Sequence, residues 1–76
     1  MTIFAGFAPY FEAPTPSPDG TNKVFELTYA PATYGLALFN NGLYQYPPQT
    51  YTIFGKTITF TTAPEADDEL FAHYIF

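Results

Sequence analysis

The sequence predicts an all-β protein, a small antiparallel β-sandwich or barrel of about six strands with an extended N-terminal arm. Three observations lead to this fold class. Short runs rich in aromatic and β-branched residues alternate with turn signals throughout residues 23–76. An Asn-Gly pair, the strongest short signal for a β-hairpin, lies between two apolar runs. No window keeps the i, i+3, i+4 apolar spacing of an amphipathic helix.

The first predicted hairpin is centred on Asn41-Gly42. Residues 36–39 form a continuous apolar run, which fits a strand covered on both faces, and residues 43–46 form the return strand. Asn41 and Gly42 are the structural turn, because both residues tolerate the positive φ that a two-residue hairpin requires. Upstream, residues 23–29 alternate apolar and polar side chains, which predicts a strand with one buried face.

A second hairpin is predicted across Gly55-Lys56, where residues 51–54 pair with residues 57–61. The last predicted strand, residues 70–76, carries apolar side chains on both of its faces. Because apolar surface is stabilised when it leaves water, we expect something to cover each face of this strand.

The N-terminal part of the chain differs from the rest in composition. Residues 1–22 are predicted to be an extended aromatic arm with a Pro-rich linker, and residues 23–76 the β module. Three prolines at alternate positions of the linker fix φ and remove amide donors, so neither a helix nor a central strand can run through it. Pro18-Asp19-Gly20 is a turn signal at its end.

Charge and cysteine content disfavour several kinds of function. The chain has two lysines and no arginine against seven Asp and Glu residues, which gives a net charge of −5. This balance disfavours nucleic acid and anionic membranes, which attract Lys and Arg. With no cysteine and one histidine, the chain is predicted to have no disulfide, no zinc site and no cofactor. A chain of 76 residues builds a thin core, so we expect contacts with other chains to add stability.

No catalytic set can be assembled from the sequence. His73 is the only histidine, and the only serine lies between two prolines, so no nucleophile–base pair is predicted. We interpret His73 as a packing or interface residue. Glu65, Asp67, Asp68 and Glu69 crowd one loop but lack the spacing of a calcium-binding loop, so they predict a solvated acidic loop. The chain is therefore predicted to bind no metal and not to be an enzyme.

Residues 24–76 contain four stretches that together form a recognisable pattern: VFELTYAP (24–31), LALFNNGLYQ (36–45), YTIFGKTITF (51–60) and APEADDELFAHY (63–74). This pattern resembles a small β module common in the virion proteins of tailed bacteriophages. In that family it reads, loosely, as VFxLxxxP, LxxxxNGLxQ, YTIxGxTITF and APxxGDxLxxxY.

Two loops depart from that pattern. Residues 48–50 stand where the family often has Gly-x-Asp, and Asp67-Asp68 stands where it usually has Gly-Asp. The module occurs in tail fibres, in neck and tail appendages, and in small capsid-decorating proteins. The resemblance therefore implies a location in the virion, into which the protein would be assembled in the host cytoplasm.

The arm lies outside this resemblance and is the predicted partner interface. Its rings could fold over the protein's own sheet, or they could cross to another subunit, which the proline spacer favours. The expected partners are the major capsid protein or another virion protein, and further copies of this chain in a homotrimer. The predicted interface residues are Ile3, Phe4, Phe7, Tyr10 and Phe11.

The predicted function is that of a capsid decoration or cement protein, which stabilises the shell through the arm and through homotypic contacts. One alternative is a tail-fibre, neck or baseplate adaptor protein. A second is a carbohydrate-binding module for host attachment, in which Tyr44, Tyr46 and Tyr51 stack on glycans.

Overall fold

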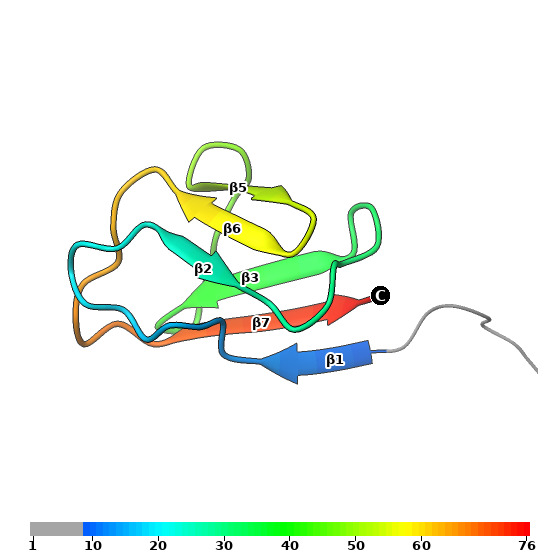
Figure 1. Cartoon of the computed structure of the whole chain (residues 1–76), viewed down its shortest axis with the longest axis horizontal. Helices are drawn as coiled ribbons and strands as arrows, with labels where there is room; N and C mark the ends of the chain where they lie inside the picture. The colour runs from blue at the N-terminus through cyan, green and yellow to red at the C-terminus, as the bar shows by residue number, and fades with distance from the viewer. Residues whose placement is uncertain (1–8) are drawn as a thin grey trace, which may run out of the picture.

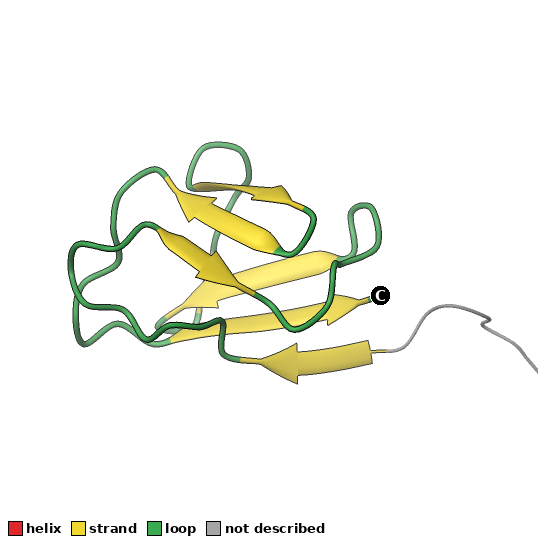
Figure 2. Cartoon of the chain, in the orientation of Figure 1, coloured by secondary structure: helices red, strands yellow, loops and turns green. Residues whose placement is uncertain are grey.

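The computed structural model describes residues 9–76, which form seven β-strands and no helix (Figures 1 and 2). The predicted all-β fold class is confirmed. Six of the strands lie within residues 23–76, and one more precedes them. The strands are β1 (Pro9–Glu12), β2 (Val24–Glu26), β3 (Leu36–Asn40), β4 (Leu43–Tyr44), β5 (Tyr51–Phe54), β6 (Thr57–Phe60) and β7 (Leu70–Ile75).

The strands form two antiparallel sheets that pack on each other. One sheet has four strands in the order β1-β7-β3-β4, and the other has three in the order β2-β6-β5. Figure 1 shows the smaller sheet lying across the larger one, with the acidic loop and the proline linker together at one end. The molecule is therefore a small β-sandwich rather than a closed barrel.

Both predicted hairpins are confirmed. Asn41 and Gly42 have φ values of 55° and 83°, and they join β3 to β4. Gly55, with a φ of 62°, begins the turn between β5 and β6. Asparagine and glycine adopt positive φ at low cost, so these residues allow two-residue turns.

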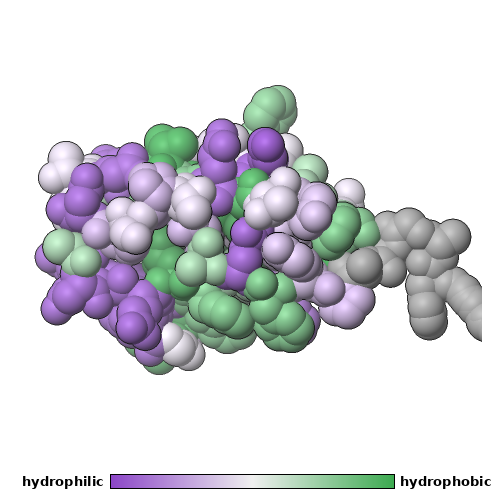
Figure 3. Space-filling model, turned by 60° about the horizontal axis from the view of Figure 1, so that its bottom comes forward, coloured by the Kyte–Doolittle hydropathy of each residue, from purple (hydrophilic) through white to green (hydrophobic). Residues whose placement is uncertain are grey.

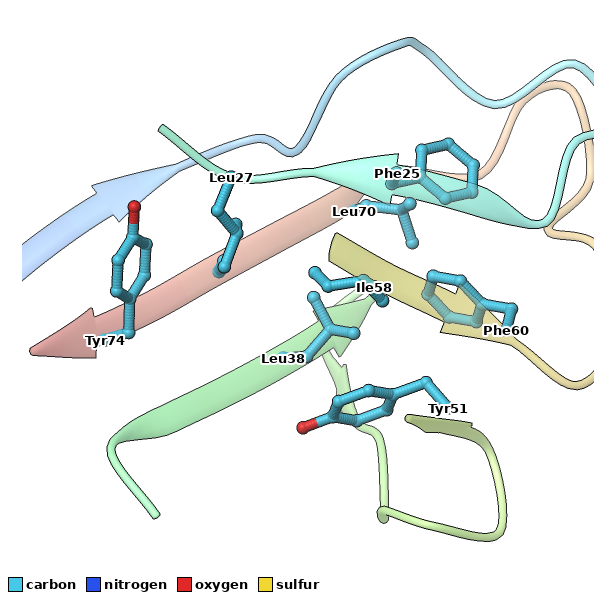
Figure 4. Close-up of a cluster of buried hydrophobic side chains, with 9 residues drawn as sticks. Phe25, Leu27, Leu38, Tyr51, Ile58, Phe60, Leu70 and Tyr74 are labelled. Carbon is cyan, nitrogen blue, oxygen red and sulfur yellow. The ribbon is translucent and has the colours of Figure 1, made fainter. Parts of the chain in front are cut away.

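The core lies between the two sheets and is built by strand alternation (Figure 4). In β7 every second residue is buried, and β6 contributes its two apolar residues in the same way. Aromatic rings supply much of the buried volume. The buried hydrophobic residues are Phe25, Leu27, Leu38, Tyr51, Ile58, Phe60, Leu70, Ala72 and Tyr74.

Two predicted strands are shorter than the sequence indicated by two residues or more, and those predicted over 57–61 and 70–76 end one residue early. The strand expected over residues 23–29 ends at Glu26, because the next amides bond elsewhere. The Leu27 N–H donates to the Lys56 carbonyl, and the Thr28 N–H donates to the Glu12 carboxylate. The return strand expected over residues 43–46 ends at Tyr44.

The structure departs from the predicted division of the chain at residue 22. Pro9–Glu12, part of the predicted arm, is β1 and pairs along its whole length with β7. The predicted linker is docked as well, since Pro14 is buried and Thr15 exchanges two backbone hydrogen bonds with Glu26. The edge of β7 offers unpaired backbone groups, and β1 satisfies them.

Tyr34 is held in a backbone conformation that tyrosine rarely adopts. Its φ is 60°, and it lies in a turn closed by a 2.8 Å hydrogen bond from the Gly35 N–H to the Ala32 carbonyl. Its side chain is fully exposed, at 102% of the reference area, so no packing offsets the backbone cost. For residues other than glycine this conformation costs roughly 1–2 kcal/mol.

Tyr34→Gly should therefore stabilise the domain by about 1 kcal/mol, because glycine adopts this φ without strain. Thermal unfolding measures the change, and the melting temperature should rise by roughly 4–8 °C for a domain of this size. Tyr34→Ala keeps a Cβ and serves as the control, which should not gain stability. A lower melting temperature for the glycine variant would contradict this interpretation of the turn.

Candidate functional site

The outward side of the four-stranded sheet is covered by aromatic and apolar side chains. In β7 the buried residues alternate with Phe71, His73 and Ile75, which point away from the core and are exposed. Phe71 keeps 45% of its surface accessible. Antiparallel register places their cross-strand neighbours on the same side of the sheet. We call this side the outer face and define it by Phe11, Phe39, Tyr44, Phe71, His73 and Ile75.

Phe11 extends the outer face across β1. It lies opposite His73 in the β1–β7 pair, and the two rings stack with centroids 4.1 Å apart and planes 10° apart. Its ring centroid is 6.0 Å from that of Phe71. Phe11 remains exposed after these contacts, so the three rings form one open surface.

The part of the outer face that lies across β7 from Phe11 is on β3 and β4. Phe39 is paired in register with Phe71 on one side and with Tyr44 on the other. The ring centroids of Phe39 and Tyr44 are 5.9 Å apart, and Tyr46 follows at 5.1 Å from Tyr44. In Figure 3, which turns the β1 and β7 side forward, hydrophobic residues gather in the lower middle of the view. Apolar rings therefore cross all four strands.

A groove of about 770 Å³ continues the outer face at the end where β7 begins. Phe39, Leu70 and Phe71 contribute to its lining from the sheet. Pro14 and Pro18 of the linker line it as well. The remaining lining comes largely from the acidic loop that precedes β7, at residues 66–69.

Within the acidic loop, Asp68 has a structural role. Its carboxylate accepts hydrogen bonds from the Asn40 and Asn41 side-chain amides, at 3.1 and 2.8 Å, and from the Glu65 N–H at 2.9 Å. These bonds hold the pKa of Asp68 below its ordinary value. The sequence predicted a solvated loop, and the side chains of Glu65, Asp67 and Glu69 are indeed exposed. Asp68 differs, because its hydrogen bonds attach the loop to the β3–β4 hairpin.

Glu12 fastens β1 to the chain segment that follows β2. Its carboxylate accepts three hydrogen bonds: from the Tyr74 hydroxyl at 2.5 Å, and from the Thr28 N–H and hydroxyl, each at 2.7 Å. Partial burial raises the pKa of Glu12, but these bonds outweigh it and leave the pKa below its ordinary value. Burial, followed by the bond to Glu12, raises the pKa of Tyr74 to about 12.

Glu12→Gln should remove the part of the domain's pH-dependent stability that comes from the Glu12 carboxylate on β1. Because the folded-state pKa is lowered, the stabilisation by the charged form is fully present well above the ordinary glutamate pKa, and it is lost as pH falls through the folded pKa. The melting temperatures of wild type and variant should therefore differ most near neutral pH and converge in acid. Glu26→Gln is the control, because Glu26 makes no side-chain hydrogen bond within residues 9–76. Parallel pH profiles for wild type and Glu12→Gln would contradict this role.

Of the five predicted interface residues, the structure describes Tyr10 and Phe11, and it places them on different sides of β1. Tyr10 is half-buried, and its ring contacts those of Tyr29, Tyr74 and Phe76 at 5.2 to 5.9 Å. The prediction that Tyr10 faces a partner is therefore corrected: the ring packs on its own domain because it shares the inner side of β1 with Glu12. Phe11 is exposed on the outer face. The other three predicted residues lie outside the described residues: Ile3, Phe4 and Phe7.

The predicted glycan-stacking set is not brought together. Tyr51 is buried, because the first residue of β5 points into the core and packs near Phe60 (Figure 4). Its assignment as a stacking residue is wrong. Tyr44 and Tyr46 are exposed neighbours, but their planes differ by 60°, so the two rings do not form one flat platform.

Two structural features were sought within residues 9–76: a cluster of metal-ligating side chains and a membrane-spanning helix. In that range no three His, Cys, Asp or Glu side chains gather as a metal site would require. The same part of the chain has no helix long and apolar enough to cross a membrane. His73, the one candidate base, stacks on Phe11 in the middle of the outer face.

Sequence reasoning missed that the outer face is a single surface, although one signal for it was present. The strand over residues 70–76 was recognised as apolar on both sides. What was missing was the strand order, which places Phe11 of β1 and Phe39 of β3 on opposite sides of β7 although the three strands are far apart in the sequence.

Comparison with known protein families, with curated proteins and with solved structures finds no match to this chain. The resemblance to the bacteriophage module therefore stays a prediction from the sequence.

Proposed function

We propose that this protein is a structural, non-enzymatic component of a tailed-bacteriophage particle and that it docks on the particle through its outer face. The observation that supports docking is the open set of aromatic rings across all four strands. Exposed apolar patches on small proteins usually mark contact sites. The virion setting rests on the sequence resemblance of residues 24–76 alone.

Among virion roles we propose capsid decoration, with the major capsid protein as the partner. Covering the exposed half of a ring such as Phe71 contributes roughly 1 kcal/mol, so a single copy binds through several modest contacts. Many copies on a repeating lattice make such contacts effective together. Because the protein would bind only the assembled shell, binding stabilises the shell by mass action.

Quantitative mass spectrometry tests this proposal on gradient-purified particles of the bacteriophage that encodes the chain. We expect the protein in the particles in constant proportion to the major capsid protein. A few copies per particle, confined to the tail, would instead favour the tail-fibre, neck or baseplate adaptor. Particles without the protein would overturn the virion proposal.

A further inference from the structure

Both lysines lie beside strands of the three-stranded sheet, whereas four of the seven carboxylates lie at residues 65–69, directly before β7 of the four-stranded sheet. Lys23 and Lys56 both belong to the three-stranded sheet: the Lys23 carbonyl accepts from the Phe60 N–H, and the Lys56 carbonyl accepts from the Leu27 N–H. The strands of the four-stranded sheet contain no lysine or arginine. The end of this sheet where the groove lies is therefore acidic without compensation from the same sheet.

Two carboxylates of the groove take no part in side-chain hydrogen bonds among the described residues. Asp67 and Glu69 line the groove and are exposed, and neither side chain makes a hydrogen bond within residues 9–76. They contrast with Asp68 between them, whose oxygens are occupied by Asn40, Asn41 and Glu65. In Figure 3 hydrophilic residues gather at the left end of the view, beside the hydrophobic ones.

The groove thus combines two kinds of surface at close range. Phe39, Phe71 and the linker prolines offer apolar contact, and Asp67 and Glu69 offer negative charge that is exposed to solvent. An apolar segment alone would leave these carboxylates near a surface from which water is removed, which is unfavourable. A segment that also brings a positive charge places that charge beside them and removes the penalty.

We propose that this groove binds an extended segment of a partner protein that carries an apolar side chain flanked by lysine or arginine. This proposal rests on the docking role of the outer face and gives the partner segment its chemistry. The apolar side chain lies on Phe39 and Phe71, and the flanking cation lies against Asp67 and Glu69. A second copy of this chain is disfavoured as the occupant, because its net charge of −5 repels an acidic groove.

The test uses the full chain and three synthetic peptides with one apolar pattern. Their sequences are acetyl-GKFKLKG-amide, acetyl-GQFQLQG-amide and acetyl-GEFELEG-amide. Affinity is measured by isothermal titration at ionic strengths of about 20 mM and about 500 mM, and amide shifts of the protein locate the contact by NMR. We expect the lysine peptide to bind, to shift the amides of residues 66–71, and to weaken at high salt.

Single substitutions then separate the groove from general attraction to an acidic protein. Asp67→Asn and Glu69→Gln should each weaken binding roughly threefold at low salt, as expected for exposed ion pairs. Phe71→Thr should weaken it roughly tenfold or more. Glu26→Gln removes the same charge from β2, which does not line the groove, and should leave binding unchanged.

Three outcomes would overturn the proposal. The first is that the lysine and glutamate peptides bind with equal affinity. The second is that Glu26→Gln weakens binding of the lysine peptide as much as Glu69→Gln does. The third is that the protein self-associates and Phe71→Thr abolishes this self-association. The proposed function fails separately. If particles carry the protein but Asp67→Asn and Glu69→Gln bind them as wild type does, only the chemistry of the groove is refuted. If the peptide results hold and particles lack the protein, only the virion role is refuted.

Discussion

Leu38→Ala is expected to lower the free energy of unfolding by about 2–5 kcal/mol, the range for a leucine removed from a tightly packed core. Leu38 is the middle residue of β3 and has 0% of its surface exposed. Its side chain lies between the two sheets, near Tyr51 and Ile58 (Figure 4). A domain of this length has a total stability of roughly 4–11 kcal/mol, so this loss is a large fraction of the total.

Leu43→Ala is the matched control for this substitution. Leu43 lies on β4 of the same sheet but is 70% exposed, so its truncation removes little buried area and should change stability by less than about 0.5 kcal/mol. Urea denaturation of both variants measures the difference. Similar losses at the two positions would contradict the assignment of the core to the space between the sheets.

The second large effect concerns docking. Phe11→Thr combined with Phe71→Thr should weaken binding to bacteriophage particles roughly a hundredfold, because each ring is an exposed aromatic anchor of the outer face. Threonine is suited to strands, so β1 and β7 should still form. Co-sedimentation with particles measures binding, and circular dichroism verifies that the variant is folded.

Phe54→Thr provides the comparison for docking. Phe54 is the most exposed phenylalanine on the other sheet, at 89%, and lies on β5, away from the outer face. Its replacement should leave co-sedimentation unchanged. If Phe54→Thr abolishes binding and the double variant does not, the docking surface is the three-stranded sheet instead.

Local sequence signals predicted most of the fold because they act between neighbouring residues. The Asn41-Gly42 and Gly55-Lys56 turns specify their hairpins through backbone conformation. The pattern of residues 70–76 predicted the strand β7 and two apolar faces on it, but not which of the two faces is buried. These features need no knowledge of where distant segments lie.

Contacts between distant segments explain what the sequence did not predict. Residues 9–12 show no regular alternation of polar and apolar side chains, and they become a strand because the edge of β7 is available to them. Glu12 bonds to Thr28 and to Tyr74, which lie 16 and 62 positions further along the chain. No local pattern indicates such partners, so Glu12 was not a candidate.

The candidate site was predictable only in part, for a related reason. Tyr44, Tyr46 and Tyr51 look alike in sequence, yet only Tyr51 is at a position of its strand that faces the core. Phe11 was expected to face a partner, and its position on the outer face agrees with that use. Which side of a strand is covered depends on how the two sheets stack, and composition does not determine that.

The proposal that the outer face docks on a virion is tested most directly by a cryo-electron microscopy reconstruction of the decorated particle. We predict that the β1-β7-β3-β4 sheet lies against the capsid, with Phe11 and Phe71 within contact distance of a neighbouring subunit and the β2-β6-β5 sheet toward solvent. A reconstruction in which the four-stranded sheet faces solvent, with its rings uncovered, would contradict it.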